Sequence, residues 1–229
     1  MTSDAGLAID EHEGLTLRER KRLAAREALS SAAIRLAMEK GLEHVRVEDI
    51  AAEVGVSPRT FNNYFSSKEE AICAITIRRN GRIADLLINR PADEPIWTAV
   101  TNAVSEHYGD MTGEVPREFI AKFRLLLDSD ALRGEFLKAH GEVERKLSLA
   151  VAQRTGTDVE RDLGPMLLAG AITSAMRVGM HRWLNHDRES TIADCVRAAL
   201  DELANGLPSL TKPSLSANRN DETHHNDDD

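Results

Sequence analysis

Apolar residues recur every three or four positions along most of the chain, which is the period of a helix with one buried face. Leu29, Ala33 and Leu36 mark such a face in a first helix, which we expect to begin after Thr16 and to end at Lys40. No segment shows the sustained alternation of apolar and polar residues that is typical of a half-buried strand. The pattern therefore predicts an all-α protein.

Short local signals delimit the first two helices. Thr16 and Glu19 have the spacing of a capping box, and Gly41 is placed to stop the first helix in a left-handed conformation. A short second helix is expected over 47–54, and Gly55 ends it. The chain then turns sharply.

Two further helix starts follow within a few residues. Ser57 is a predicted N-cap with Pro58 in the first turn, and Ser67 with Glu70 forms a second predicted capping box. The helix that starts there is long and ends before Pro91. About nine helices are expected in all, the later ones near 95–111, 116–128, 131–155, 159–186 and 190–205.

Composition supports this interpretation and restricts the class of protein. The 229 residues are 41% hydrophobic but only 4% aromatic, which favours packed helices rich in alanine and leucine. We find no apolar run of the ~18 residues that cross a bilayer, and no secretory segment at the N-terminus. Cys73 and Cys195 lack metal-ligand spacing and are read as buried thiols. A cytoplasmic protein with no membrane span, metal or cofactor is expected.

The net charge of −9 is distributed unevenly. Most of the net negative charge, −7, lies in residues 1–14 and 206–229, the two terminal segments that we expect to be flexible, whereas five basic residues oppose only Glu19 at the start of the first helix. Basic side chains often do no more than solvate a helix face, but their position matters more than the total charge for nucleic-acid binding. The five are Arg18, Arg20, Lys21, Arg22 and Arg26.

The order helix, glycine-containing turn, helix over 47–65 is the helix-turn-helix pattern, whose second helix enters the DNA major groove. Arg59 could bind guanine, Asn62 or Asn63 adenine, and the Thr60 methyl group a thymine methyl. We expect Phe61 and Phe65 to anchor this helix in the core. Tyr64 and Lys68 are candidates for phosphate contacts.

The motif VEDIAAEVGVSPRTFNNYFSSKEE, Val47 to Glu70, resembles the DNA-binding domain of the TetR (tetracycline-repressor-like) transcriptional regulators, and the resemblance covers residues 16–72. Members usually carry threonine where this chain has Arg46, and tyrosine where it has Asn62; an arginine could still contact phosphate. The candidate DNA-contacting residues are Arg46, Ser57, Pro58, Arg59, Thr60, Asn62, Asn63, Tyr64 and Lys68.

The resemblance implies an N-terminal three-helix DNA-binding domain over 16–66 and a helical ligand-binding and dimerisation domain over 67–207. We expect residues 1–15 to be a flexible acidic segment and 208–229 a disordered acidic tail. The resemblance also implies a homodimer, bound to a palindromic double-stranded operator, in which the last two helices of each chain pair with their mates. The expected interface residues are Ala171, Ala175, Gly179, Ile192, Val196, Ala199 and Leu203, although these could instead pack within one chain.

A small-molecule effector is implied as well. The central helices carry aromatic and methionine side chains, which favours a mainly apolar ligand, and the stretch 90–95 resembles a linker in a branch tied to acyl-coenzyme-A-like ligands. The candidate pocket residues are Trp97, His107, Phe119, Phe123, Arg124, Phe136, His140, Met176, Arg177 and Met180.

Three alternatives to a repressor differ in what the sequence says about them. An enzyme is disfavoured because the chain has no Gly-rich phosphate loop, nucleophile elbow, His-Glu-x-x-His or Cys-x-x-Cys motif. A helical protein-interaction adaptor would not need the polar side chains that surround Arg59. An activator has the same sequence features as a repressor.

Overall fold

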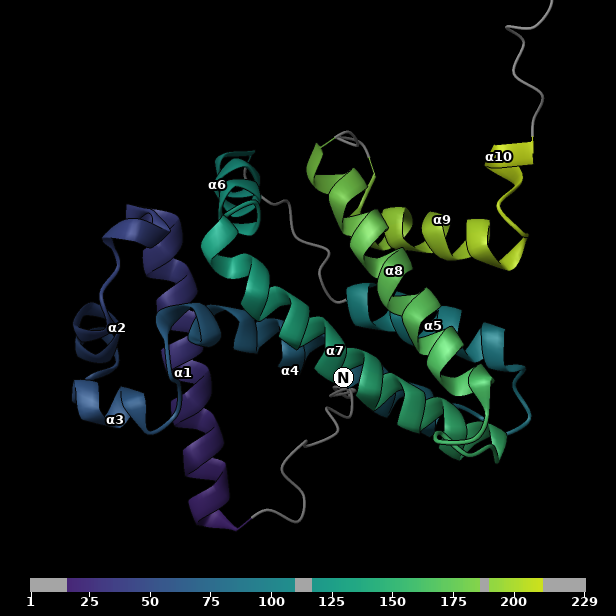
Figure 1. Ribbon diagram of the computed structural model, residues 1–229, viewed down its shortest axis with the longest axis horizontal. Helices are drawn as coiled ribbons and strands as arrows, with labels where there is room; N and C mark the ends of the chain where they lie inside the picture. The colour runs from purple at the N-terminus through teal and green to yellow at the C-terminus, as the bar shows by residue number, and fades with distance from the viewer. Residues whose placement is uncertain (1–15, 110–116, 186–189, 212–229) are drawn as a thin grey trace, which may run out of the picture.

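A computed structural model describes residues 16–109, 117–185 and 190–211, and within these ranges the chain is helical and has no strand. The all-α prediction is confirmed (Figure 1). The elements in chain order are α1 Leu17–Lys40, the 3₁₀ helix η1 Leu42–His44, α2 Val47–Val54, α3 Pro58–Asn62, α4 Lys68–Asn89, α5 Ile96–Gly109, α6 Arg117–Leu127, α7 Asp130–Thr155, α8 Leu163–Asn185, α9 Ile192–Ala204 and α10 Pro208–Thr211.

The helix ends agree with the local signals, with two differences. The Thr16 capping box is present, since the Glu19 amide donates to the Thr16 hydroxyl at 3.3 Å and the Glu19 carboxylate accepts from the Thr16 amide at 2.8 Å. Gly41 has φ 85° and ψ 144°, so its φ is positive but it is not in the left-handed helical region that we predicted. Only one contact of the predicted second capping box is present. The Glu70 carboxylate was expected to accept from the Ser67 amide, but it accepts from the amide and hydroxyl of Ser66.

The buried side chains form two hydrophobic clusters at opposite ends of the protein. The first cluster joins α1, α2, α3 and the start of α4, and α6 and α7 add Leu126, Leu132 and Ala139. The second joins the rest of α4 with α5, α8, α9 and the second half of α7. The helices α4 and α7 thus contribute to both clusters and lie across the molecule between them (Figure 1). A movement of either helix would therefore change the packing of both clusters.

The C-terminal end of α4 is tied to α7 by one side chain. The Arg154 guanidinium donates to the backbone carbonyls of Leu87, Arg90, Pro91 and Glu94; three of these bonds measure 3.5, 2.9 and 3.0 Å, in the order Leu87, Arg90, Glu94. Arg90 also binds the Glu94 carboxylate through two nitrogens, and this contact holds the pKa of Glu94 below its ordinary value of 4.5. These contacts therefore hold the connection between α4 and α5 in place.

The C-terminal half contains one unusually apolar helix and one difference from the predictions. By length and composition α8 could cross a membrane, but one of its faces packs against α7 and α9 in the second cluster. The predicted disordered tail begins too early, because α10 occupies Pro208–Thr211. Residues 1–15 and 212–229, for which flexibility was also predicted, lie outside the described residues.

Candidate nucleic-acid interface

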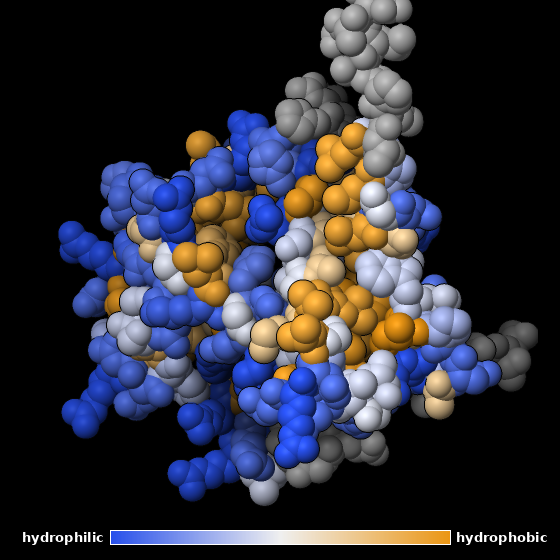
Figure 2. Space-filling view, turned by 45° about the vertical axis from the view of Figure 1, so that its right-hand side comes forward, coloured by the Kyte–Doolittle hydropathy of each residue, from blue (hydrophilic) through white to orange (hydrophobic). Residues whose placement is uncertain are grey.

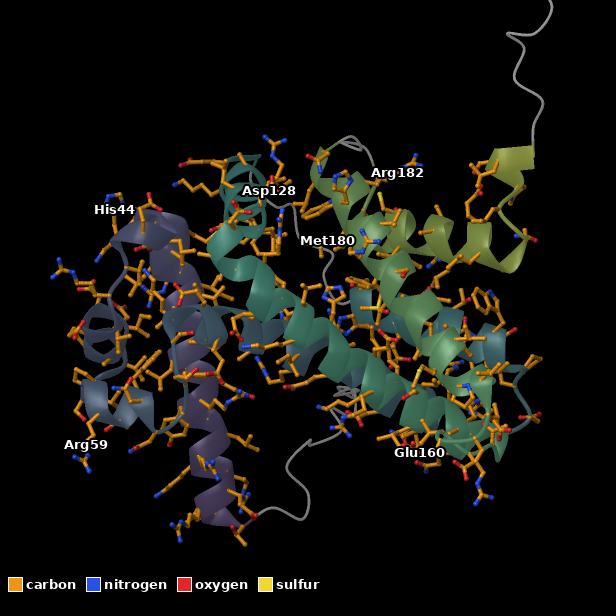
Figure 3. The ribbon with its side chains drawn as sticks, viewed as in Figure 1. His44, Arg59, Asp128, Glu160, Met180 and Arg182 are labelled. Carbon is orange, nitrogen blue, oxygen red and sulfur yellow. The ribbon has the colours of Figure 1, made fainter. Side chains whose placement is uncertain are left out.

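The short helix α3 is built to present polar side chains from a rigid base. The Ser57 hydroxyl caps it by accepting from the Thr60 amide at 3.1 Å, and the two hydroxyls lie 2.9 Å apart. Pro58 occupies the first turn, where its missing N–H costs nothing. Arg59 is exposed and points outwards from the body of the protein (Figure 3). The N-terminal end of α3 is thus ordered and accessible.

Two phenylalanines hold α3 in place. Phe61 and Phe65 are buried, with ring centroids 5.6 Å apart, in the same cluster as Leu36 and Ile50. Burying side chains of this size contributes roughly 1.5–3 kcal/mol each. The turn before α3 needs Gly55, whose φ of 74° lies in the left-handed region. The predicted anchoring of the helix is confirmed.

The remaining α3 candidates differ in exposure. Asn62 and Asn63 are exposed, whereas Tyr64 is half-buried and packs against the first cluster. Arg46, at the start of α2, is exposed; its amide donates to the Asp49 carboxylate at 3.1 Å, and its guanidinium makes no capping bond. These side chains therefore lie on or beside the outer face of the helix-turn-helix.

Lys68 does not present its ammonium group to that face. Its Nζ donates to the carbonyls of Leu42 and Val45, at 2.7 and 2.8 Å. The side chain is half-buried and links the start of α4 to the η1 segment that precedes α2. The two backbone carbonyls use two of the three donors of this ammonium, and its expected phosphate contact stays a prediction. Its role in the structure is to fix the helix-turn-helix onto α4.

A groove separates α3 from the start of α1, and the sequence-based candidate list covers only one of its walls. Residues from α3 line one side and basic residues of α1 line the other. The charge pattern did single out Arg18 and Arg22, but it could not show that they face α3. The lining residues are Thr16, Arg18, Glu19, Arg22, Thr60, Asn63 and Tyr64.

The candidate pocket residues do not form one described site. Phe123 and Phe136 pack against the first cluster, whereas Trp97, Met176 and Met180 belong to or pack against the second. The other five are separately placed. His107 is buried edge-on against Tyr108, Phe119 is half-exposed and stacks on Phe123, Arg124 donates to the Asn185 side chain at 3.4 Å, and His140 and Arg177 line an open groove on α7 and α8.

The expected interface residues of α8 and α9 largely face each other within the chain. A Cβ atom at Gly179 would lie 2.6 Å from the Cα of Val196, so α9 packs directly on the backbone of α8. Ala175 and Ile192 are buried as well. Of the seven residues, these four are therefore corrected to an intrachain contact, which needs the small side chains. The remaining three, which are partly buried, are Ala171, Ala199 and Leu203.

The exposed apolar side chains of α8 lie on its other face. Leu163, Met166, Leu167 and Val178 are 79%, 58%, 68% and 50% exposed. Figure 2 shows hydrophobic side chains gathered on the side of the molecule formed by α8 and α9. This surface, defined by the four residues, is called the α8 face below.

A helix-turn-helix joined to a second helical unit by two shared long helices is the architecture typical of helix-turn-helix transcriptional regulators. Residues 29–72 match the profile described as bacterial regulatory proteins, tetR family, and residues 94–208 match the MftR C-terminal domain. The chain belongs to the TetR family of transcriptional regulators.

Relatives and solved structures agree with this assignment. The transcriptional regulator TcmR of Streptomyces glaucescens is 31% identical over 199 residues, which are 83% of this chain and 87% of TcmR. The structure of FadR, a fatty acid degradation regulator from Bacillus halodurans, matches with a TM-score of 0.53 at 19% identity, over 80% of this chain and 96% of FadR. FadR of Thermus thermophilus, solved with lauroyl-CoA, has a TM-score of 0.50 at 17% identity over 80% and 94% of the two chains. These structures show the shared fold.

Proposed function

We propose that this regulator is a cytoplasmic repressor that binds a palindromic operator as a homodimer and is released by a mainly apolar small molecule. The observation that carries the proposal is α3, a capped helix seated on two buried phenylalanines with its polar side exposed. A rigid helix of this kind can place side chains against base edges without a large loss of conformational entropy on binding.

Base recognition is assigned to exposed and half-buried side chains in α3 and at its C-terminal cap. The Arg59 guanidinium has the two parallel donors that fit guanine O6 and N7, and Asn62 or Asn63 can pair with adenine. The Thr60 methyl group suits a thymine methyl, and Arg46 suits a phosphate. A single short helix contacts few base pairs, so useful specificity requires two copies that read half-sites about 34 Å apart or a multiple of that distance.

The α8 face supports the homodimer. Four large apolar side chains lie exposed there at helical spacing, over a helix whose opposite side is already packed on α9. Large exposed apolar patches usually mark interaction sites in soluble proteins. A second copy of α8 and α9 related by a two-fold axis would cover this face and form a four-helix bundle. In this proposal the α8 face replaces the buried Ala175–Gly179 stripe as the main contact.

The proposed effector is a fatty-acyl or acyl-CoA-like molecule. The support consists of the structural similarity to FadR solved with lauroyl-CoA and the apolar side chains that line the central helices. A ligand that separates α7 from α4 would tilt α4, because its far end is held by Arg154 while its start carries the DNA-binding helices. To move the population from 1:99 to 99:1, the ligand must favour the non-binding state by about 5.5 kcal/mol.

The DNA-binding part of the proposal is tested with a randomised duplex pool. We expect the purified protein to select a palindromic sequence, here called the selected duplex, and to bind it with steep salt dependence in fluorescence anisotropy. Arg59→Ala should weaken binding to it by about 1–3 kcal/mol and relax base choice at one position per half-site. The matched control is Arg161→Ala, next to Glu160 on the opposite side of the molecule (Figure 3). Equal losses on selected and random duplexes would contradict the role of Arg59.

The effector and the dimer are tested separately. Native mass spectrometry of the purified protein should show two chains and, where a ligand is retained, its mass. Lauroyl-CoA should release the selected duplex at concentrations that leave a Lys/Arg-rich control protein bound. Leu167→Asp on the α8 face should shift the protein to a monomer that retains its helical circular dichroism. A dimer that survives this substitution would contradict the proposed interface.

A further inference from the structure

The groove between α1 and α3 has a row of guanidinium groups along one wall. Arg18 and Arg22 are four residues apart on α1, so they lie on the same face of that helix, about 6 Å apart along its axis. Arg26 continues the row by another turn, and its guanidinium lies 4.8 Å from the centroid of the Phe65 ring. Phe65 lies three residues beyond the end of α3, so the row runs alongside α3.

The charges in this groove are available to a ligand. Arg18 and Arg22 are exposed and form no ion pair with any residue in the described part of the chain. One carboxylate, that of Glu19, also lines the groove. It already accepts from the amide and the hydroxyl of Thr16, and these bonds hold its pKa below 4.5. The groove therefore offers two free cations against one engaged anion.

The opposite wall suits an anion with many oxygen atoms. Asn63 and Tyr64 contribute an amide and a phenol, both of which donate hydrogen bonds to phosphate in protein–DNA interfaces. An apolar effector would find few partners in such a lining. The groove is also continuous with α3, and DNA that places base edges at Arg59 must bring its own backbone close to this helix.

We propose that the α1–α3 groove binds the DNA backbone beside the bases that α3 contacts, with Arg18 and Arg22 each neutralising one phosphate. This inference rests on the proposed DNA-binding function. The two arginines lie ahead of residues 29–72, where the family profile matches, so they form an additional contact in the first two turns of α1. Their contribution is electrostatic, equal for all sequences, and sensitive to salt.

The test compares two variants that change charge on different faces of the same helix. In Arg18→Gln/Arg22→Gln both groove cations are removed, whereas Arg20→Gln removes a cation about 200° around the helix from each of them. Binding to the selected duplex and to a random duplex is measured by anisotropy over a salt series. For the double variant we expect the slope of log Kobs against log salt to become shallower by about 1.8 per protomer, on both duplexes.

The Arg20→Gln control, which removes one charge, should change the slope by much less than half of the change in the double variant. A change of about 0.9 in Arg20→Gln would overturn the proposal, because equal changes per removed charge would indicate a general field of the helix instead of a groove contact. Unchanged slopes in both variants would overturn it as well. Selection of no duplex by the wild-type protein would instead contradict the proposed function itself, so the two failures are distinguishable. Circular dichroism melting of each variant verifies that the fold is intact.

A second measurement tests a variant in which the salt slope should change in the opposite direction. Glu19→Gln keeps a side chain that can complete the capping box and removes the one negative charge from the groove, so the salt slope should become steeper and binding tighter.

Methylphosphonate substitution in the DNA then locates the contact. Neutralising a phosphate that binds in the groove should weaken the wild-type complex but not that of the double variant. The same loss in both proteins at every phosphate would place the arginines elsewhere.

Discussion

Replacing Gly179 by alanine tests how closely α8 and α9 pack within one chain. The added Cβ would meet the Cα of Val196 at 2.6 Å, its Cγ2 at 2.7 Å and its backbone nitrogen at 2.8 Å. Ordinary contact begins at 3.4 Å, so α9 must move by 3.4 − 2.6 = 0.8 Å. Because two of the three atoms belong to the backbone, no side-chain rotation relieves the clash. The movement would disturb the packing of Ile192 and Leu200, which are buried beside it.

The expected cost follows from two opposing terms. Overpacking of a core costs roughly 1–3 kcal/mol, while replacing a mid-helix glycine by alanine returns up to about 1 kcal/mol. We expect Gly179→Ala to lower the free energy of unfolding by about 1–2 kcal/mol, measured by urea denaturation at constant protein concentration. In Gly141→Ala, a position on α7 where a Cβ meets nothing within 4 Å, the same change should be neutral or stabilising. A Gly179→Ala protein as stable as Gly141→Ala would refute the close packing.

Three further experiments probe other contacts. Lys68→Met should lower the free energy of unfolding by about 2 kcal/mol, because two backbone carbonyls lose a charged donor. Lys40→Met, which changes an exposed lysine, should leave the free energy of unfolding unchanged. An unchanged urea midpoint for Lys68→Met would contradict this expectation. Glu94→Gln should melt at a lower temperature than wild type at pH 7. Since Arg90 lowers the pKa of Glu94, its stabilisation is present above pH 4.5 and lost as the pH falls further, so the difference should shrink there; a gap that widens would reverse the assignment. Burial raises the pKa of Cys73 to about 12, so at pH 8 a thiol reagent should modify it only as the protein unfolds, and rapid labelling of folded protein would argue against that burial.

Much of the N-terminal domain could be predicted because its determinants are local. The N-caps at Thr16 and Ser57, the helix-ending Gly55 and the apolar period each act within a few residues, and the structure reproduces α1, α2 and the start of α3. The burial of Phe61 follows from the same reasoning, since a four-residue spacing places it on the inner face with Phe65.

The roles of three long side chains depended on neighbours that are distant in the sequence. Lys68 has the type and position expected of a phosphate contact, yet its ammonium reaches carbonyls 23 and 26 residues away. Arg154 binds carbonyls 60 to 67 residues earlier in the chain. Arg22 could be recognised as basic, but only the packing of α1 beside α3 shows that it lines a groove.

The small residues of α8 likewise show what the sequence could predict and what depended on the tertiary structure. Their spacing indicates correctly that another helix approaches closely, but the spacing is identical whether that helix belongs to the same chain or to a partner. In the structure Val196 of the same chain fills the space over Gly179, and the exposed leucines lie on the opposite side. By itself, the sequence determined most of the helices and the helix-turn-helix pattern, because those depend on interactions within one or two turns. Only the tertiary structure decided which faces are covered and which charges remain free, because burial and hydrogen bonding between distant segments exist only after the helices have packed.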